Sequence, residues 1–222
     1  MKYKTAIFDL DGTITDSGPG IMNSIRYALK KRGLPELPEE ELRRFIGPPL
    51  KERFQAVFGL TEEESVQMTA DYREYYGEKG IFENSVYEGV PEMLERLRAS
   101  GVRILMATAK PEYYARIIAG HFDFAKYFEF IGGSCMDGRR TDKHEVIEYV
   151  LETCSVSHED RESTVMIGDR SNDMTGAGKS GIHSLGVLYG YGSREELEGA
   201  GAQALAETPG KAADLILGIK ES

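Results

Sequence analysis

The sequence predicts an α/β fold in which a parallel sheet is interrupted by one long helical insertion. Short apolar runs alternate with amphipathic helical stretches along most of the 222 residues, and this alternation is typical of a parallel sheet covered by helices. About ninety residues separate the first apolar run from the second, whereas a crossover between parallel strands needs only about a dozen. The excess length predicts a separate helical unit between these two strands.

Five apolar runs are the predicted strands of the sheet: Thr5–Phe8, Arg103–Ala107, Phe128–Ile131, Thr164–Ile167 and Ser184–Leu188. The insertion is predicted to be helical at Gly20–Arg32, at Pro38–Phe45, from Pro49 to about Phe58, and from Thr61 onward. We therefore expect residues 1–15 and 83–222 to form the core and residues 16–82 to form an inserted helical cap.

Several helix starts carry recognisable capping residues. The capping-box pattern, an N-cap residue followed three positions later by glutamate, occurs at Thr61, Asp142 and Ser193. Proline stands in the first turn of two further predicted helices, at Pro91 and at Pro209. The glycine-rich residues 186–192 lack the spacing of a dinucleotide fingerprint, so they are predicted to form a strand exit and a loop.

Composition excludes several classes of partner. The formal charge of −10 opposes binding to a nucleic acid polymer or to an anionic membrane surface. No apolar stretch approaches the roughly 20 residues that cross a bilayer, and a strand follows the first few residues directly, so we expect a cytoplasmic protein.

Cys135 and Cys154 lack metal-ligand spacing and are expected to be reduced thiols. The expected oligomeric state is a monomer or a homodimer.

The first predicted strand ends in two carboxylates, Asp9 and Asp11. Side chains two positions apart on an extended chain point the same way, and Gly12 permits a sharp turn that exposes both. Taken alone, the segment also fits an ordinary turn rich in Asp and Gly. Other predicted strands favour the functional interpretation, because ligands of open α/β sheets bind beyond the carboxyl ends of the strands.

Polar residues follow three other predicted strands. They are Thr108, Ala109 and Lys110 after the second strand, Lys143 beyond the third, and Asp169 and Asp173 after the fourth. Each has an ordinary structural interpretation, such as a strand-end hydroxyl or a carboxylate at a helix start. Their combination on one edge of one sheet favours a shared site.

Phosphoryl transfer is the chemistry that uses this combination. Asp9 and Asp169 are oxygen ligands suited to Mg²⁺, which shields an anionic phosphate ester from an attacking carboxylate. Lys143, the Thr108 hydroxyl and nearby backbone N–H groups, that of Ala109 among them, are predicted to bind phosphate oxygens. An aspartate serves as nucleophile in such reactions, and Asp11 is placed to exchange protons with the leaving oxygen and with water.

The chain resembles phosphatases of the haloacid dehalogenase superfamily. The signatures that carry the resemblance appear in order as Asp9-Leu10-Asp11-Gly12-Thr13, Thr108, Lys143, and Gly168-Asp169 with Asp173. The resemblance covers essentially the whole chain, because the helical insertion matches the C1 cap of the branch that contains phosphoglycolate phosphatases. Ala109 and His144 depart from the residues that many relatives carry there, without removing a catalytic side chain.

The resemblance implies a Rossmann-like three-layer core, Mg²⁺ dependence, and defined roles for the signature residues. Asp9 would be the nucleophile and Asp11 the general acid and base, with Thr108 and Lys143 completing the catalytic set. The metal would be bound by Asp9, by the backbone carbonyl of Asp11 and by Asp169, with Asp173 supporting the site. The second aspartate, Asp11, also excludes the dehalogenase branch, which lacks it.

Substrate choice is expected to come from the cap. Arg43, Gly47, Pro48 and Lys51 lie in and around a turn that would present a positive edge to an anionic substrate, although charged residues there also fit solvated helix faces. The turn Ile46-Gly47-Pro48-Pro49-Leu50 and the segment from Leu188 to Ser193 resemble the corresponding segments of relatives described as phosphoglycolate phosphatases or 5′-nucleotidases. The expected partner is therefore a small anionic phosphomonoester, 2-phosphoglycolate or a nucleoside 5′-monophosphate.

Two other functions compete with the phosphatase. A phosphomutase of the β-phosphoglucomutase type shares the core signatures, but the cap lacks the Arg-Gly-x-x-Arg pattern expected of it. A catalytically inert binding module would keep the fold without turnover, and the intact signature residues argue against it.

Overall fold

The structure is a computed structural model that describes residues 2–219, and it divides the chain into two compact units. One unit contains the residues up to Thr15 together with those from Val86 onward, and the other contains Asp16–Ser85. The second unit is inserted into the first, as predicted from the roughly ninety residues between the first two predicted strands.

A six-stranded parallel sheet forms the centre of the larger unit, in the order β5-β4-β1-β6-β7-β8. Its strands are β1 (Thr5–Phe8), β4 (Arg103–Pro111), β5 (Phe130–Ser134), β6 (Thr164–Gly168), β7 (His183–Val187) and β8 (Ala204–Ala206). All four residues of β1 are buried, because this strand lies between β4 and β6. From β1 the strand order continues through β4 and β5 on one side and through β6, β7 and β8 on the other. This reversal of strand order creates the switch point where ligands bind in such sheets.

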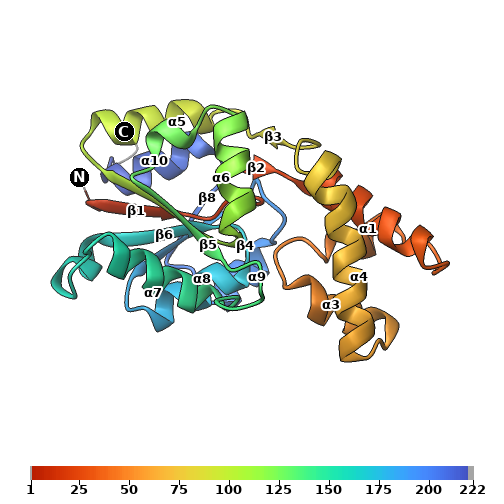
Figure 1. Cartoon of the computed structure of the whole chain (residues 1–222). Helices are drawn as coiled ribbons and strands as arrows, with labels where there is room; N and C mark the ends of the chain where they lie inside the picture. Colours follow the sequence, from red (N-terminus) through yellow and green to blue (C-terminus); the bar gives the residue numbers. More distant parts are fainter. Residues whose placement is uncertain (1, 220–222) are drawn as a thin grey trace. The chain divides into compact units, whose positions relative to one another are not determined.

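Helices cover both faces of this sheet (Figure 1). They are α5 (Val90–Ala99), α6 (Glu112–His121), α7 (Lys143–Thr153), α8 (Ser171–Lys179), α9 (Arg194–Gly199) and α10 (Pro209–Leu217). α5 packs against α10, and α7 packs against α8 on the opposite face. Ile7, Leu105 and Met166 from the sheet pack with Ile147 and Val150 of α7 in a fully buried core cluster. The predicted α/β architecture is confirmed.

Of the five predicted strands only β1 has its predicted limits; β6 ends one residue later, at Gly168, and β7 lies one residue earlier, at His183–Val187. β8 was not predicted, because a three-residue, partly exposed edge strand leaves no apolar run in the sequence. β4 continues four residues past its predicted end at Ala107, through a bulge. β5 begins at Phe130 instead of Phe128, since a short 3₁₀ turn at Ala125–Tyr127 precedes it. The sequence did not predict that β5 continues to Ser134, because Gly132 and Gly133 interrupt the apolar run.

The smaller unit is helical. It contains α1 (Gly18–Lys31), α2 (Glu39–Arg43), α3 (Leu50–Phe58), α4 (Glu62–Tyr75) and a π-helical turn, η1 (Tyr76–Gly80). Both α1 and α3 pack against α4, and Ile25, Phe54 and Met68 are fully buried among them. α2 is shorter than the predicted Pro38–Phe45.

The smaller unit ends at Ser85, three residues beyond the predicted limit at Phe82. Glu83 accounts for the difference, because it is tied to the helices of this unit. Its carbonyl accepts a hydrogen bond from the Gly20 N–H, and its carboxylate accepts from Asn23 and from the Tyr75 hydroxyl. The strands β2 (Thr15–Asp16) and β3 (Ser85–Val86) pair where the chain enters and leaves the insertion.

Of the three predicted capping boxes, the one at Thr61 forms completely. Thr61 and Glu64 form a complete capping box at α4, and Thr208 caps α10 by accepting from the Lys211 N–H. The predicted boxes at Asp142 and Ser193 form only in half. Each side chain caps its helix, but the reciprocal glutamate bond is missing.

No helix among residues 2–219 is long and apolar enough to cross a membrane.

Candidate active site

The site begins where β1 ends. The Asp9 N–H donates to the Ile167 carbonyl of β6 at 2.9 Å, so the sheet holds the backbone of Asp9 in place. The chain then turns back through Gly12, whose φ of +83° lies in the left-handed region that favours glycine. The Gly12 N–H closes the turn on the Thr15 carbonyl at 2.8 Å. This turn places Asp9 and Asp11 at the carboxyl edge of the sheet, as predicted from their spacing.

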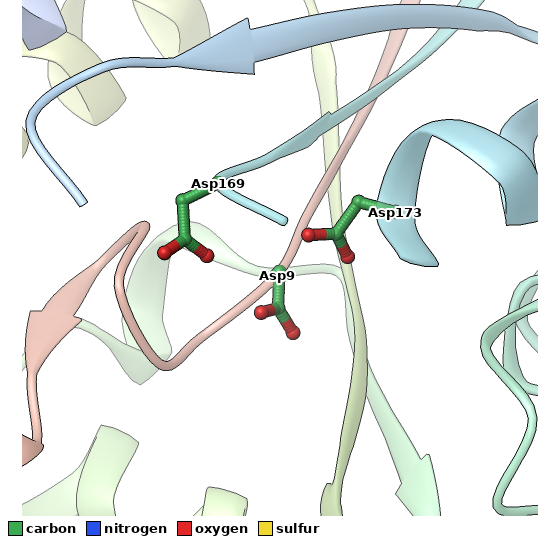
Figure 2. Close-up of side chains that lie close together, drawn as sticks. All are labelled: Asp9, Asp169 and Asp173. Atoms are coloured by element: carbon green, nitrogen blue, oxygen red, sulfur yellow. The ribbon is translucent and has the colours of Figure 1, made fainter. Parts of the chain in front are cut away.

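Three buried carboxylates from separate segments meet at this edge, as Figure 2 shows. Asp9 follows β1, Asp169 follows β6, and Asp173 lies in the first turn of α8. One oxygen from each lies within 4.8 Å of the others. Three carboxylates this close together, and all buried, repel one another unless cations neutralise them.

Lys143 supplies one such cation. Its Nζ lies 2.7 Å from Asp9 Oδ1 and 2.8 Å from Asp173 Oδ1, and it donates to the Ala107 carbonyl at 3.1 Å. Burial disfavours the charged form of Lys143, but the charges of Asp173 and Asp9 outweigh this and raise its pKa. The lysine is therefore held as a cation that fixes the Asp9 side chain.

One lysine does not neutralise three carboxylates. Burial and the charges of Asp173 and Asp9 raise the pKa of Asp169 well above its ordinary value. Burial, opposed by Lys143, raises the pKa of Asp173 to about 6. Asp169 Oδ1 is buried and has no hydrogen-bond partner among the described residues. A cluster of hard oxygen donors with an unpartnered, buried carboxylate oxygen fits a divalent cation such as Mg²⁺.

Glycines surround Asp169 because there is no room for larger residues. A Cβ atom at Gly12 would lie 2.1 Å from Asp169 Oδ2, and one at Gly190 would lie 2.4 Å from Asp169 Cβ. The Tyr191 N–H donates to Asp169 Oδ2 at 2.7 Å. The glycine-rich loop after β7, predicted only as a strand exit, thus fixes the orientation of this carboxylate.

β4 contributes Thr108 and Lys110. Thr108 is buried, and its Oγ1 accepts a hydrogen bond from the Lys110 N–H at 3.2 Å, which leaves its own proton available to a ligand. Ala109 is half-buried beside it. Lys110 Nζ forms a buried ion pair with Asp11 Oδ2 at 2.9 Å. The two aspartates of the first loop thus have one lysine partner each.

The structure places all the predicted core residues at this one edge of the sheet, at the ends of β1, β4 and β6 and at the starts of α7 and α8: Asp9, Asp11, Thr108, Ala109, Lys143, Asp169 and Asp173. The predicted specificity residues Arg43, Gly47, Pro48 and Lys51 lie in the smaller unit. There, Arg43 pairs with Glu39 at 2.9 Å and Lys51 pairs with Glu62 at 2.8 Å. Neighbouring carboxylates thus offset both predicted cap charges.

The sequence placed Lys110 beside Thr108 after the second strand but assigned it no role, and it did not indicate a role for Tyr191. Lys110 stands two positions after Thr108, and this spacing places both side chains on one face of a strand. The predicted strand ended at Ala107, so the sequence did not predict that Lys110 continues the strand toward Asp11. Tyr191 acts through its backbone N–H, which no side-chain pattern reveals.

The fold and the site together define a class. A parallel sheet whose switch point gathers three buried carboxylates, a buried lysine and a strand-end hydroxyl is built for chemistry on an anionic ester. A family model described as haloacid dehalogenase-like hydrolase matches residues 6–187. The chain belongs to this family and is an enzyme of its phosphatase class.

The chain is also similar to individual proteins, several of them named as phosphatases. A 5′-nucleotidase of Pseudomonas aeruginosa is 41% identical over 197 residues, which are 89% of this chain and 88% of that protein. Tyrosine-protein kinase PtkA of Mycobacterium tuberculosis is 40% identical over 193 residues, covering 86% of this chain but only 64% of PtkA. A crystal structure described as a predicted phosphatase from Clostridium acetobutylicum superposes with a TM-score of 0.93 at 39% identity, over 99% of this chain and 100% of that one.

Proposed function

We propose that this protein hydrolyses small phosphomonoesters with the help of Mg²⁺, through a phosphorylated Asp9. The observation that carries the proposal is the set of three buried carboxylates at the switch point of the sheet, two of which pair with Lys143. Asp9 is the carboxylate of this set that follows the central strand, and Lys143 binds it at 2.7 Å.

In the first step, an Asp9 carboxylate oxygen attacks the phosphorus atom, and the bond from phosphorus to the ester oxygen breaks. Asp11 gives its proton to that oxygen, which leaves as an alcohol. In the second step, Asp11 takes a proton from water while the water oxygen attacks the same phosphorus. The bond to Asp9 then breaks, so inorganic phosphate leaves and both carboxyl groups return to their starting states.

The remaining residues bind the phosphoryl group. Lys143 fixes Asp9 and adds positive charge beside it, and the Thr108 hydroxyl has a proton available for a phosphate oxygen. Mg²⁺, when bound, would offset the negative charge of the phosphate ester and of the carboxylates that approach it. Asp9 and Asp169, with the Asp11 carbonyl, are the proposed ligands, and Asp173 supports them by holding Lys143.

The proposed substrates are nucleoside 5′-monophosphates, with 2-phosphoglycolate as the alternative. The similarity to a 5′-nucleotidase over nearly the whole of both chains supports the first choice. Arg43, Gly47, Pro48 and Lys51 remain proposed contributors to substrate choice. Their effect is expected to be modest at Arg43 and Lys51, where ion pairs already offset the charges.

The test is phosphate release with Mg²⁺ from nucleoside 5′-monophosphates, 2-phosphoglycolate and β-glucose 1-phosphate. We expect turnover of at least one of the first two, and its loss by at least about a hundredfold in EDTA and in the Asp9→Asn variant. An Asp9→Asn protein with near-normal turnover would show that another residue is the nucleophile. Conversion of β-glucose 1-phosphate without phosphate release would identify a phosphomutase instead.

The relative named tyrosine-protein kinase justifies one additional assay. A tyrosine peptide is incubated with radiolabelled ATP, and the phosphorylated peptide is incubated separately with Mg²⁺. We expect no labelled peptide, and any phosphate released in the second reaction should depend on Asp9. Labelling of the peptide would contradict the assignment as a hydrolase.

A further inference from the structure

The two carboxylate oxygens of Asp11 lie in different surroundings. Oδ2 is bound by Lys110 Nζ at 2.9 Å, in a pair whose side chains are only 12% and 5% exposed. Oδ1 is buried and has no hydrogen-bond partner among residues 2–219. One oxygen is therefore held in place, and the other is left to interact with a reactant.

A bulge in β4 brings Lys110 to this position. Thr108 pairs with Gly133 and Pro111 with Ser134, so β4 contains two residues, Ala109 and Lys110, that have no counterpart in β5. The bulge runs close over β5, since a Cβ at Gly133 would lie 2.5 Å from the Lys110 carbonyl oxygen. The Lys110 N–H also binds Thr108 Oγ1, which fixes the backbone of the lysine to a residue of the site.

Lys110 is distinct from the lysine already assigned to the site. Lys143 contacts Asp9 and Asp173, whereas the ion pair of Lys110 is with Asp11. A short carboxylate side chain rotates readily between staggered positions, and a buried ammonium group at 2.9 Å restricts it to one of them. Misplacing a reacting group by about 1 Å costs as much as a hundredfold in rate.

From these contacts we propose that Lys110 is a positioning residue for proton transfer. It holds Asp11 by Oδ2 so that Oδ1 faces the ester oxygen that leaves. This inference rests on the proposed function, because it assumes that Asp11 donates that proton. It makes a specific prediction about leaving groups, since an alkoxide needs a proton as it departs and an activated phenolate does not.

The experiment compares two substrates in the intact, Mg²⁺-saturated protein. One is whichever of the nucleoside 5′-monophosphates or 2-phosphoglycolate the wild type hydrolyses best, and the other is 2,4-dinitrophenyl phosphate. Because Asp11 also serves the shared second step, the comparison uses kcat/KM, which reports only the steps up to departure of the ester oxygen. For Lys110→Met we expect kcat/KM to fall by at least about tenfold on the first substrate and by less than about threefold on the second. Lys110→Arg, which still donates to a carboxylate, should recover part of the loss.

Two controls separate positioning from damage to the fold. Lys126→Met removes a lysine from an exposed pair with Asp123 and should leave both substrates unaffected. In an Asp11→Asn background, Lys110→Met should add less than about a twofold loss, because the side chain that it positions is already disabled. Thermal unfolding of each variant verifies that it is folded.

Equal losses of kcat/KM on both substrates would overturn the inference, because Lys110 would then act on the phosphoryl group itself. Unchanged kcat/KM on the alkyl ester, or a full further loss in the Asp11→Asn background, would also overturn it. A failure of the proposed function looks different. In that case, the wild type releases phosphate from no ester, or the Asp9→Asn protein remains active.

Discussion

Glycine at position 190 is a steric requirement of the buried Asp169 carboxylate. A Cβ there would lie 2.2 Å from the Gly12 carbonyl oxygen and 2.4 Å from Asp169 Cβ, and neither atom belongs to a flexible side-chain end. Gly190→Ala should therefore force the loop away from Asp169 and lower stability by about 1–3 kcal/mol. Activity should fall more than stability alone explains, because the Tyr191 N–H moves away from Asp169 with the loop.

Thermal unfolding and kcat measured together test this prediction. Gly178→Ala is the matched control, because Gly178 lies in α8 and a Cβ added there would meet no other atom within 4 Å. There, alanine should raise stability by about 0.5–1 kcal/mol through helix propensity. Equal behaviour of the two variants would contradict the steric argument.

At the residue scale, the sequence predicted the side chains whose spacing carries information. Asp9 and Asp11 share a face because they are two positions apart, and the structure brings both to the edge of the sheet together with Asp169. Lys110 has the same spacing from Thr108, but its pairing with Asp11 was not predicted, because the bulge that extends β4 has no hydrophobic signal. The Tyr191 contribution depends on a backbone group, so composition and periodicity do not reveal it.

Among the elements of the smaller unit, α1 and α4 are joined by ion pairs around Asp71. This carboxylate is only 6% exposed, and it pairs with Lys31 at 2.8 Å and with Arg32. Asp71→Asn should lower stability by about 1–2 kcal/mol, because the partners are partly exposed and regain solvation. Glu39→Gln, which breaks the exposed pair with Arg43, should change it by less than about 0.5 kcal/mol.

The Asp71 effect should also depend on pH. Burial opposes ionisation of Asp71, but the hydrogen bonds from Lys31 and Arg32 outweigh burial and lower its pKa. A lowered folded-state pKa contributes stability above the unfolded pKa of about 3.8, and the contribution disappears as pH falls through the folded value. The free energies of unfolding of wild type and Asp71→Asn, measured by chemical unfolding, should therefore differ at pH 7 and begin to converge only as pH falls below about 4. A constant difference would contradict the assignment.

At the element scale, pattern predicted which segments are helices and strands better than it predicted their limits. The complete capping box at α4 depends on neighbours in sequence and was predictable. The box expected at Ser193 lost its second bond because Glu196 instead accepts from the Ser171 N–H and from Arg170. Those partners lie more than twenty residues away in sequence, so only the folded chain brings them into competition.

At the scale of the whole molecule, the stabilisation that Mg²⁺ binding provides should depend on pH. The folded state raises the pKa of Asp169, and that of Asp173 to about 6, through burial and the surrounding carboxylates. A raised folded-state pKa contributes stability below the unfolded value of about 3.8, and this contribution is lost as pH rises through about 6. The metal-free protein should therefore lose stability from these groups across that interval.

Mg²⁺ binds the deprotonated carboxylates, so its stabilising effect should grow from about pH 5 to about pH 7.5. At a hundred times its Kd, the expected gain is about 2.7 kcal/mol, or roughly 5–10 °C in Tm. Thermal unfolding in Mg²⁺ and in EDTA at several pH values measures this, with Asp169→Asn as the control in which the gain should shrink. A gain that is independent of pH would mean that these carboxylates do not bind the ion.

The sequence by itself determined the α/β class, the inserted helical unit and the principal acidic and basic side chains of the site. These features follow from local rules: apolar periodicity, the two-residue repeat of a strand, and the meeting of parallel strand ends at one edge of a sheet. Only the tertiary structure decided which lysine pairs with which aspartate, which cap charges neighbours offset, and which glycines must remain glycines. Those outcomes depend on distances between segments far apart in the chain, and such distances exist only after the sheet and helices have packed.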